Sequence, residues 1–127
     1  MDPLLHKIDC VQLPVPDLEA GLAFYCDQLG LELKWRRETQ AGLVLGDSEL
    51  VLSTEPRGLE VDLLVESAVD AAARVVAAGG RVLVDPFDIP VGRVVVVEDP
   101  FANPLVLLDL SKGTFDTDDD GNVTGVS

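Results

Sequence analysis

An internal repeat is the feature of this sequence that most constrains its fold. The segment CVQLPVPDLEAGLAFYCDQLGLEL, which begins at Cys10, aligns without a gap with EVDLLVESAVDAAARVVAAGGRVL, which begins at Glu60. Each copy opens with alternating apolar residues, which are typical of a strand, and continues with a helix-capping residue and a glycine stop. Because two copies are too few for a solenoid, the repeat predicts two similar modules that share one interior.

Each module is expected to run strand, helix and three short strands. The first helix has Asp17 as its N-cap and ends at Gly30, and the second has Ser67 as its N-cap and ends at Gly79–Gly80. The three strands after each helix are expected at about 31–37, 42–45 and 49–53, and at about 81–84, 93–98 and 104–109. The fold class is therefore α+β, with paired βαβββ modules that form curled sheets around a cup and helices outside.

Length and charge narrow the range of functions. With 127 residues the chain suits a single domain, with module one at about 5–55, module two at about 58–112 and an acidic tail at 113–127. A net charge of −14 argues against nucleic acid as a partner and is compatible with neutral or cationic ligands. The sequence contains neither a signal-peptide pattern nor an apolar run of about 20 residues, so we expect a cytoplasmic protein that does not bind a membrane.

Two segments resemble the vicinal oxygen chelate superfamily, which includes glyoxalase I, extradiol dioxygenases and bleomycin-resistance proteins. VQLPVPDLEAGLAFYCDQLGLEL is similar to the opening strand and helix of that superfamily, and VVVVEDPFANPLVLLDL is similar to its final turn and strand. Ala102 stands where the superfamily has glycine, so the turn must avoid a positive φ or accept strain. The scaffold hosts isomerases, dioxygenases, lyases and pure binders, so it does not by itself define an activity.

The resemblance also implies where a metal would bind. Metal-using members place four ligands, usually His and Glu, at positions that fall here on Cys10, Val51, Glu60 and Val106. Valine donates nothing to a metal, so we expect no cofactor. The alternative is a divalent metal held by a shifted set of His6, Cys10, Glu49 and Glu60.

Cys10 and Glu60 leave several interpretations open. Cys10 could be a metal ligand, a nucleophile or a small packed side chain, and we favour packing. His6 on the same strand would be about 13 Å away, which is too far for it to serve as a direct base. Glu60 is the candidate catalytic residue, since burial in the cup would raise its pKa, but it could equally lie solvated at the mouth.

The residues expected to contact a ligand come from several strands and one loop. Trp35 could stack a planar ligand or serve as a core residue, and Phe101 could form part of the cup wall. The full expected set is Cys10, Gln12, Trp35, Val51, Glu60, Phe101 and Val106.

The tail sequence DTDDDGNVTGVS imitates a calcium-binding EF-hand loop. Asp116, Asp118 and Asp120 have the required spacing, but Ser127 stands where a bidentate Glu is needed. We expect the tail to be flexible or to fold back across the sheet.

Three functional hypotheses follow. The favoured one is a metal-independent small-molecule binder that resembles bleomycin-resistance proteins and holds a cationic or aromatic ligand. The second is a glyoxalase-like lyase or isomerase, or a dioxygenase, with a reduced metal-ligand set. The third is a non-catalytic regulatory or interaction module. By resemblance, the protein is expected to be a homodimer.

Overall fold

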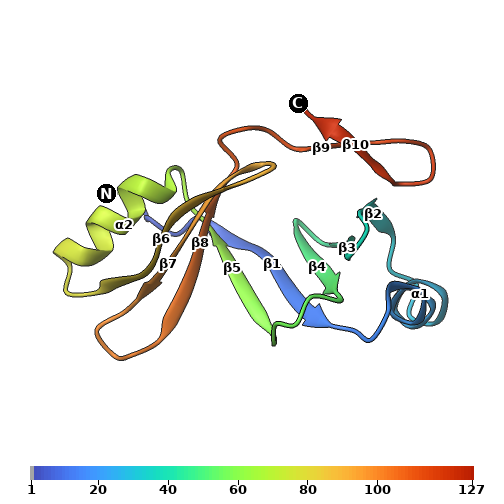
Figure 1. Cartoon of the computed structure of the whole chain (residues 1–127), viewed down its shortest axis with the longest axis horizontal. Coiled ribbons are helices and arrows are strands. Elements are labelled where there is room, and N and C mark those ends of the chain that lie inside the picture. The colour runs from blue at the N-terminus through green and yellow to red at the C-terminus, as the bar shows by residue number, and fades with distance from the viewer. Residues whose placement is uncertain (1) are drawn as a thin grey trace. The chain divides into compact units, whose positions relative to one another are not determined.

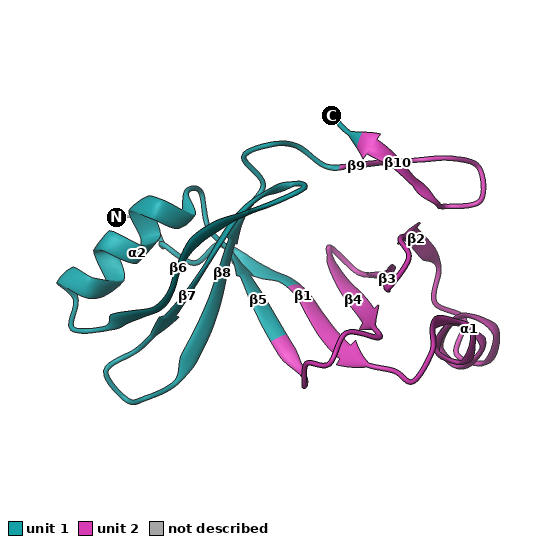
Figure 2. Ribbon diagram, viewed as in Figure 1, with its two compact units in different colours: residues 1–9, 61–114, 126–127 teal, residues 10–60, 115–125 magenta. Residues whose placement is uncertain are grey.

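The computed structural model describes residues 2–127, which divide into two compact units (Figures 1 and 2). The first module comprises residues 10–60 together with 115–125 of the tail. The second module comprises residues 2–9, 61–114 and 126–127. No helix among the described residues has both the length and the apolar character needed to cross a membrane.

The helices and strands repeat in the same order in each module. The first set is β1 (Lys7–Pro14), α1 (Leu18–Leu22), η1 (Ala23–Gln28), β2 (Leu33–Arg36), β3 (Gln40–Leu45) and β4 (Ser48–Ser53). The second set is β5 (Glu60–Leu64), α2 (Ala68–Ala77), β6 (Arg81–Ile89), β7 (Gly92–Glu98) and β8 (Pro104–Asp109). Two short strands follow in the tail, β9 (Phe115–Thr117) and β10 (Val123–Val126).

Strand pairing shows that the two modules have the same topology. The order is β2-β3-β4-β1 in the first module and β6-β7-β8-β5 in the second. The first strand of each set lies parallel to the last, β1 with β4 and β5 with β8, whereas the other pairs are antiparallel. The predicted fold class, α+β with paired βαβββ modules, is confirmed.

Both expected helix N-caps are confirmed. The backbone N–H of Ala20 donates to Asp17 Oδ1 at 2.7 Å, and the N–H of Asp70 donates to Ser67 Oγ at 3.2 Å. The first helix is not a uniform α-helix, because η1 continues it with wider π-helical turns. Leu29, the C-cap residue of η1, is 56% exposed.

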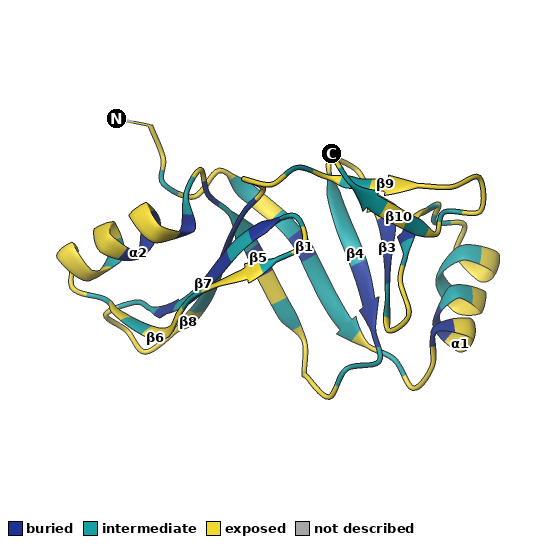
Figure 3. Ribbon diagram, turned by 45° about the horizontal axis from the view of Figure 1, so that its top comes forward, coloured by how far each residue is buried: buried dark blue, intermediate teal, exposed yellow. Residues whose placement is uncertain are grey.

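Each helix packs on one face of the strands of its own module. In the second module Val65, Val95, Val97 and Leu107 bury their side chains together with the small residues of α2. In the first module Leu18, Ala41, Leu43 and Leu52 form the corresponding cluster. Figure 3 shows buried residues on the strands and exposed residues along the outward sides of the helices.

A buried carboxylate ties the second module together. Asp109 at the end of β8 is only 3% exposed. Its Oδ2 accepts from the N–H of Ala68 at 2.8 Å, and its Oδ1 accepts from the N–H of Arg93 at 2.9 Å and from Ser111 Oγ at 2.6 Å. Burial raises the pKa of the Asp109 carboxyl, but the hydrogen bonds from Ala68, Ser111 and Arg93 outweigh it and lower the pKa. This carboxylate joins the start of α2 to the β7–β8 pair.

The tail forms a hairpin in which one acid closes the turn. Asp118 Oδ1 accepts from the N–H groups of Asp120 and Asn122, both at 2.9 Å, and Gly121 has a φ of +85°. These bonds lower the pKa of Asp118, that from Asn122 most strongly. The tail therefore folds back, which is one of the two expected outcomes. Within it, the carboxylate of Asp118 accepts hydrogen bonds that close the turn.

Candidate functional site

The candidate site lies on the face of the first module's sheet that is turned away from α1, here called the inner face. Strand alternation places Leu50 and Leu52 on the helix side of β4, and therefore Glu49 and Val51 on the inner face. The register aligns Trp35 with Gly42, Gly42 with Val51, and Val51 with Gln12, across four neighbouring strands. The inner face thus carries a continuous row of residues from β2 to β1.

Trp35, on β2 at one end of this row, lies over the backbone of Gly42 on β3. A Cβ added to Gly42 would stand only 2.1 Å from Trp35 Nε1, so the indole occupies the space that a side chain would fill. The indole N–H donates to Glu49 Oε1 at 2.8 Å, while Glu49 Oε2 pairs with Lys34 Nζ at 2.9 Å. These contacts fix the ring, which is 7% exposed, in one orientation.

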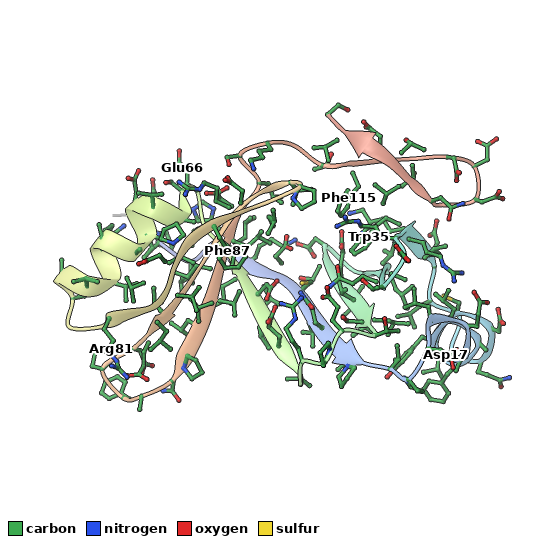
Figure 4. All side chains as sticks on the ribbon, in the orientation of Figure 1. Asp17, Trp35, Glu66, Arg81, Phe87 and Phe115 are labelled. Atoms are coloured by element: carbon green, nitrogen blue, oxygen red, sulfur yellow. The ribbon has the colours of Figure 1, made fainter. Side chains whose placement is uncertain are left out.

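The tail hairpin packs on the same face. Phe115 and Val123 contact a buried cluster that consists of Cys10, Trp35 and Val51. The rings of Phe115 and Trp35 lie 4.9 Å apart between centroids and are tilted by 48° (Figure 4). The Arg37 guanidinium lies 5.6 Å from the centre of the Phe115 ring, within cation–π range.

The four positions that would hold a metal in metal-using relatives do not supply a matching donor set. Cys10 and Val51 belong to the apolar cluster beneath the hairpin. Glu60 is half-buried and its Oε1 lies 3.7 Å from Arg57 Nη1, while Val106 offers no donor. Across residues 2–127 no group of three or more His, Cys, Asp or Glu side chains is placed to hold a metal ion. Of the four positions only Cys10 and Glu60 carry a donor atom in the side chain, whereas a divalent metal needs three or four donors.

The residues of the alternative metal-ligand set make other contacts in the structure. His6 is exposed before β1, and its backbone N–H donates to the Leu64 carbonyl at 2.8 Å. Glu49 holds Trp35 and Lys34, as described above. Glu60 is half-buried and forms an ion pair with Arg57.

The sequence-based set of ligand contacts is only partly brought together. Cys10, Trp35 and Val51 share one cluster, and Gln12 lies beside Val51 in the β1–β4 register. Phe101, in contrast, is 81% exposed in the turn between β7 and β8 of the second module.

Two residues of interest were missed by sequence reasoning. Asp62 on β5 is 6% exposed and pairs in register with Val106, so the buried acid of this strand is Asp62 and not Glu60. Strand alternation already puts the two acids on one face, but alternation does not reveal which end of a strand is buried. The contact of Phe115 with Trp35 joins residues 80 positions apart (115 − 35), and no local pattern signals it.

Comparison with known proteins agrees with this repeated βαβββ architecture. The family model of the Glyoxalase/Bleomycin resistance protein/Dioxygenase superfamily matches residues 7–107. The chain belongs to this superfamily. A search of curated proteins finds no match.

Solved structures with the same fold differ in function. The hypothetical protein BH1468 from Bacillus halodurans superposes with a TM-score of 0.69 at 20% identity, covering 81% of this chain and 93% of its own. Methylmalonyl-CoA epimerase from Mycobacterium tuberculosis gives 0.67 at 18% identity, covering 86% and 91%. Homoprotocatechuate 2,3-dioxygenase from Brevibacterium fuscum gives 0.60 at 28% identity, with 85% of this chain but only 37% of the dioxygenase covered. These likenesses establish the fold and leave the activity open.

Proposed function

We propose that this protein is a metal-independent small-molecule-binding protein, similar in role to bleomycin-resistance proteins, and that its ligand binds on the inner face of the first module. The carrying observation is the cluster of Cys10, Trp35 and Val51, in which two expected metal-ligand positions are built into an apolar surface beside an indole. An apolar surface with one fixed aromatic ring is suited to a planar ligand.

Two further observations support an aromatic ligand. Trp35 is held by Gly42 below it and by Glu49 at its N–H, so little conformational entropy is lost when a ring stacks on it. The superfamily member from Brevibacterium fuscum was solved in complex with 3,4-dihydroxyphenylacetate, which is an aromatic compound.

The test is a binding screen joined to a metal analysis. Trp35 is the only tryptophan, so its fluorescence reports directly on the inner face. We expect saturable quenching by at least one compound in a panel of aromatic and cationic metabolites and drugs, unchanged after treatment with a chelator. Elemental mass spectrometry of untagged protein, purified without chelator, should find no stoichiometric metal. Near-stoichiometric zinc, nickel, iron or manganese would instead support a metal-dependent lyase, isomerase or dioxygenase.

We further propose that the protein is a cytoplasmic homodimer. Large apolar side chains at the surface, including Phe24, Leu59 and Phe101, are available for subunit contact. Light scattering coupled to size-exclusion chromatography should give about twice the chain mass of 13.6 kDa. A single-chain mass at micromolar concentration would reject the dimer without affecting the binding proposal.

A further inference from the structure

We propose that the β9–β10 hairpin is a displaceable occupant of the ligand site, with Phe115 standing where the ring of an aromatic carboxylate binds. This inference rests on the proposed function and adds to it a ligand class and a means of control. The hairpin lies beyond residues 7–107, the part of the chain that matches the superfamily model.

The surroundings of Phe115 are those of a ring-binding position. Its phenyl ring contacts the indole of Trp35 (Figure 4). It also lies near the guanidinium of Arg37 and packs with Cys10 and Val51. An aromatic ligand that took this place would gain the same stacking and the same cation–π contact. Phe115 thus blocks, in the closed state, the position that the ligand ring would occupy.

The charge pattern next to Trp35 selects an anionic ring. The segment from Lys34 to Arg37 carries three of the nine basic residues of the chain. Lys34 is paired with Glu49 and Arg36 with Glu19. Within residues 2–127 no salt bridge joins a carboxylate to the Arg37 guanidinium, which lies 5.6 Å from the centre of the Phe115 ring. A carboxylate on the incoming ring would give Arg37 a charged partner.

The hairpin is built so that it can leave as a unit. Its own turn is closed internally, by Asp118 with Asp120 and Asn122, and β9 and β10 form a separate two-stranded sheet. Its backbone link to β2 is the bond from the Arg36 N–H to the Gly121 carbonyl at 2.7 Å, at the bridge between Arg36 and Asn122. Phe115 and Val123 are themselves only partly buried. Displacement therefore breaks this backbone bond and the packing of Phe115 and Val123, while the bonds within the turn are kept.

If the hairpin and the ligand compete for one position, the apparent affinity for the ligand depends on how often the site is open. The apparent dissociation constant equals the intrinsic constant divided by the fraction of molecules in which the site is open. Weakening the closed state should therefore tighten ligand binding. For Phe115→Ala we expect a gain in affinity of about tenfold, from loss of a half-buried aromatic contact.

The experiment titrates 1-naphthoate, an aromatic carboxylate, against the full chain and follows Trp35 fluorescence. Phe115→Ala empties the ring position, and Asp118→Ala loosens the hairpin turn without touching the site. The matched controls are Phe24→Ala, an exposed phenylalanine on η1, and Asp99→Ala, which removes the same turn-closing carboxylate from the β7–β8 loop. Cooperative thermal unfolding of every variant checks that it is folded.

The expected result is tighter binding by Phe115→Ala and Asp118→Ala, and unchanged binding by both controls. Saturation of the wild type with 1-naphthoate should also speed amide hydrogen exchange at Arg36, because its N–H loses the Gly121 carbonyl when the hairpin leaves. If Phe115→Ala does not fold, Asp118→Ala and the exchange data carry the test. Equal affinities in folded wild type, Phe115→Ala and Asp118→Ala would overturn the occupant role and leave small-molecule binding intact.

The ligand class is tested separately with Arg37→Gln. In the Phe115→Ala background this change should weaken binding of 1-naphthoate about tenfold and leave binding of the neutral 1-naphthamide unchanged. Equal losses for both compounds, or no 1-naphthoate binding by any variant, would overturn the aromatic carboxylate assignment. The broad ligand panel would then decide the proposed function on its own.

Discussion

One residue in the β7–β8 turn adopts a conformation that its side chain disfavours. Ala102 has a φ of +70°, so the turn accepts the strain foreseen from the missing glycine. The tail repeats the same turn, since Asp99 and Asp118 each close a loop by accepting from an asparagine four residues on. In the tail the corresponding position is Gly121, whose φ of +85° costs a glycine no steric strain. The chain thus contains both the alanine and the glycine form of one turn.

Comparison of these two turns predicts that Ala102→Gly stabilises the protein. Relief of the left-handed strain should exceed the entropy cost of glycine and raise the free energy of unfolding by about 0.5 to 1 kcal/mol. Chemical denaturation would measure it. Gly121→Ala is the converse change and should lower stability. A loss of stability in Ala102→Gly would show that the alanine methyl makes contacts worth more than the strain.

Asp109 predicts how stability depends on acid. Its folded pKa lies below the unfolded value of about 3.9, so its contribution is complete above that value and is lost as pH falls through the folded pKa. In Asp109→Asn the side chain keeps one acceptor oxygen, but its NH2 group then faces a backbone N–H that the carboxylate had accepted from. We expect a cost of roughly 2 to 3 kcal/mol at pH 7 and a shallower fall in stability below about pH 4. Denaturation curves at pH 7 and pH 3.5 would measure both effects. An equal loss of unfolding free energy between these pH values in wild type and Asp109→Asn would contradict the role given to Asp109.

At the scale of strands, the inner face depends on close approach between β2 and β3. Gly42→Ala would place a methyl group inside the indole of Trp35 and expel the ring. We expect a loss of about 2 kcal/mol or more in unfolding free energy and a red shift of Trp35 emission. Gly58→Ala is the matched control, because a Cβ there meets nothing within 4 Å, and it should change stability by less than about 0.5 kcal/mol. Unshifted emission in Gly42→Ala would mean that β2 can move to accept the methyl group.

Most elements could be foreseen because their signals are local. Period-two alternation located β1 and β5, and Asp17 and Ser67 marked the helix starts. Three features could not be read in this way. The π-helical turns of η1 have no residue signature, β6 continues to Ile89 through Pro86, and the tail acids have the spacing of a calcium loop although Asp118 closes a turn.

The candidate site was less predictable than the fold, since its contacts are non-local. Alternation placed Cys10 and Gln12 on one face, the superfamily resemblance added Val51, and the β1–β4 register and the shared cluster agree. The approach of Phe115 and the greater burial of Asp62 over Glu60 depend on tertiary packing, which a single sequence does not encode locally.

At the scale of the whole chain, the excess of acid should govern the response to salt. A net charge of −14 repels itself in the folded state, and the ion pairs that could oppose it are at least partly exposed and therefore weak. Raising NaCl from 50 to 500 mM should therefore increase the melting temperature by about 2 to 5 °C, measured by calorimetry. A fall in melting temperature would show that the surface ion pairs outweigh the general repulsion.

Because Cys10 is buried beneath the tail hairpin, chemical labelling of its thiol can report how often the hairpin opens. Cys10 is 4% exposed beneath Phe115, whereas Cys26 is only partly buried and has a thiol pKa raised by burial and by Asp27. A maleimide should therefore add first at Cys26, and a second addition should occur only during excursions that uncover Cys10. In a Cys26→Ser background, the rate of maleimide addition at Cys10, followed by mass spectrometry, should therefore measure the rate at which the hairpin opens.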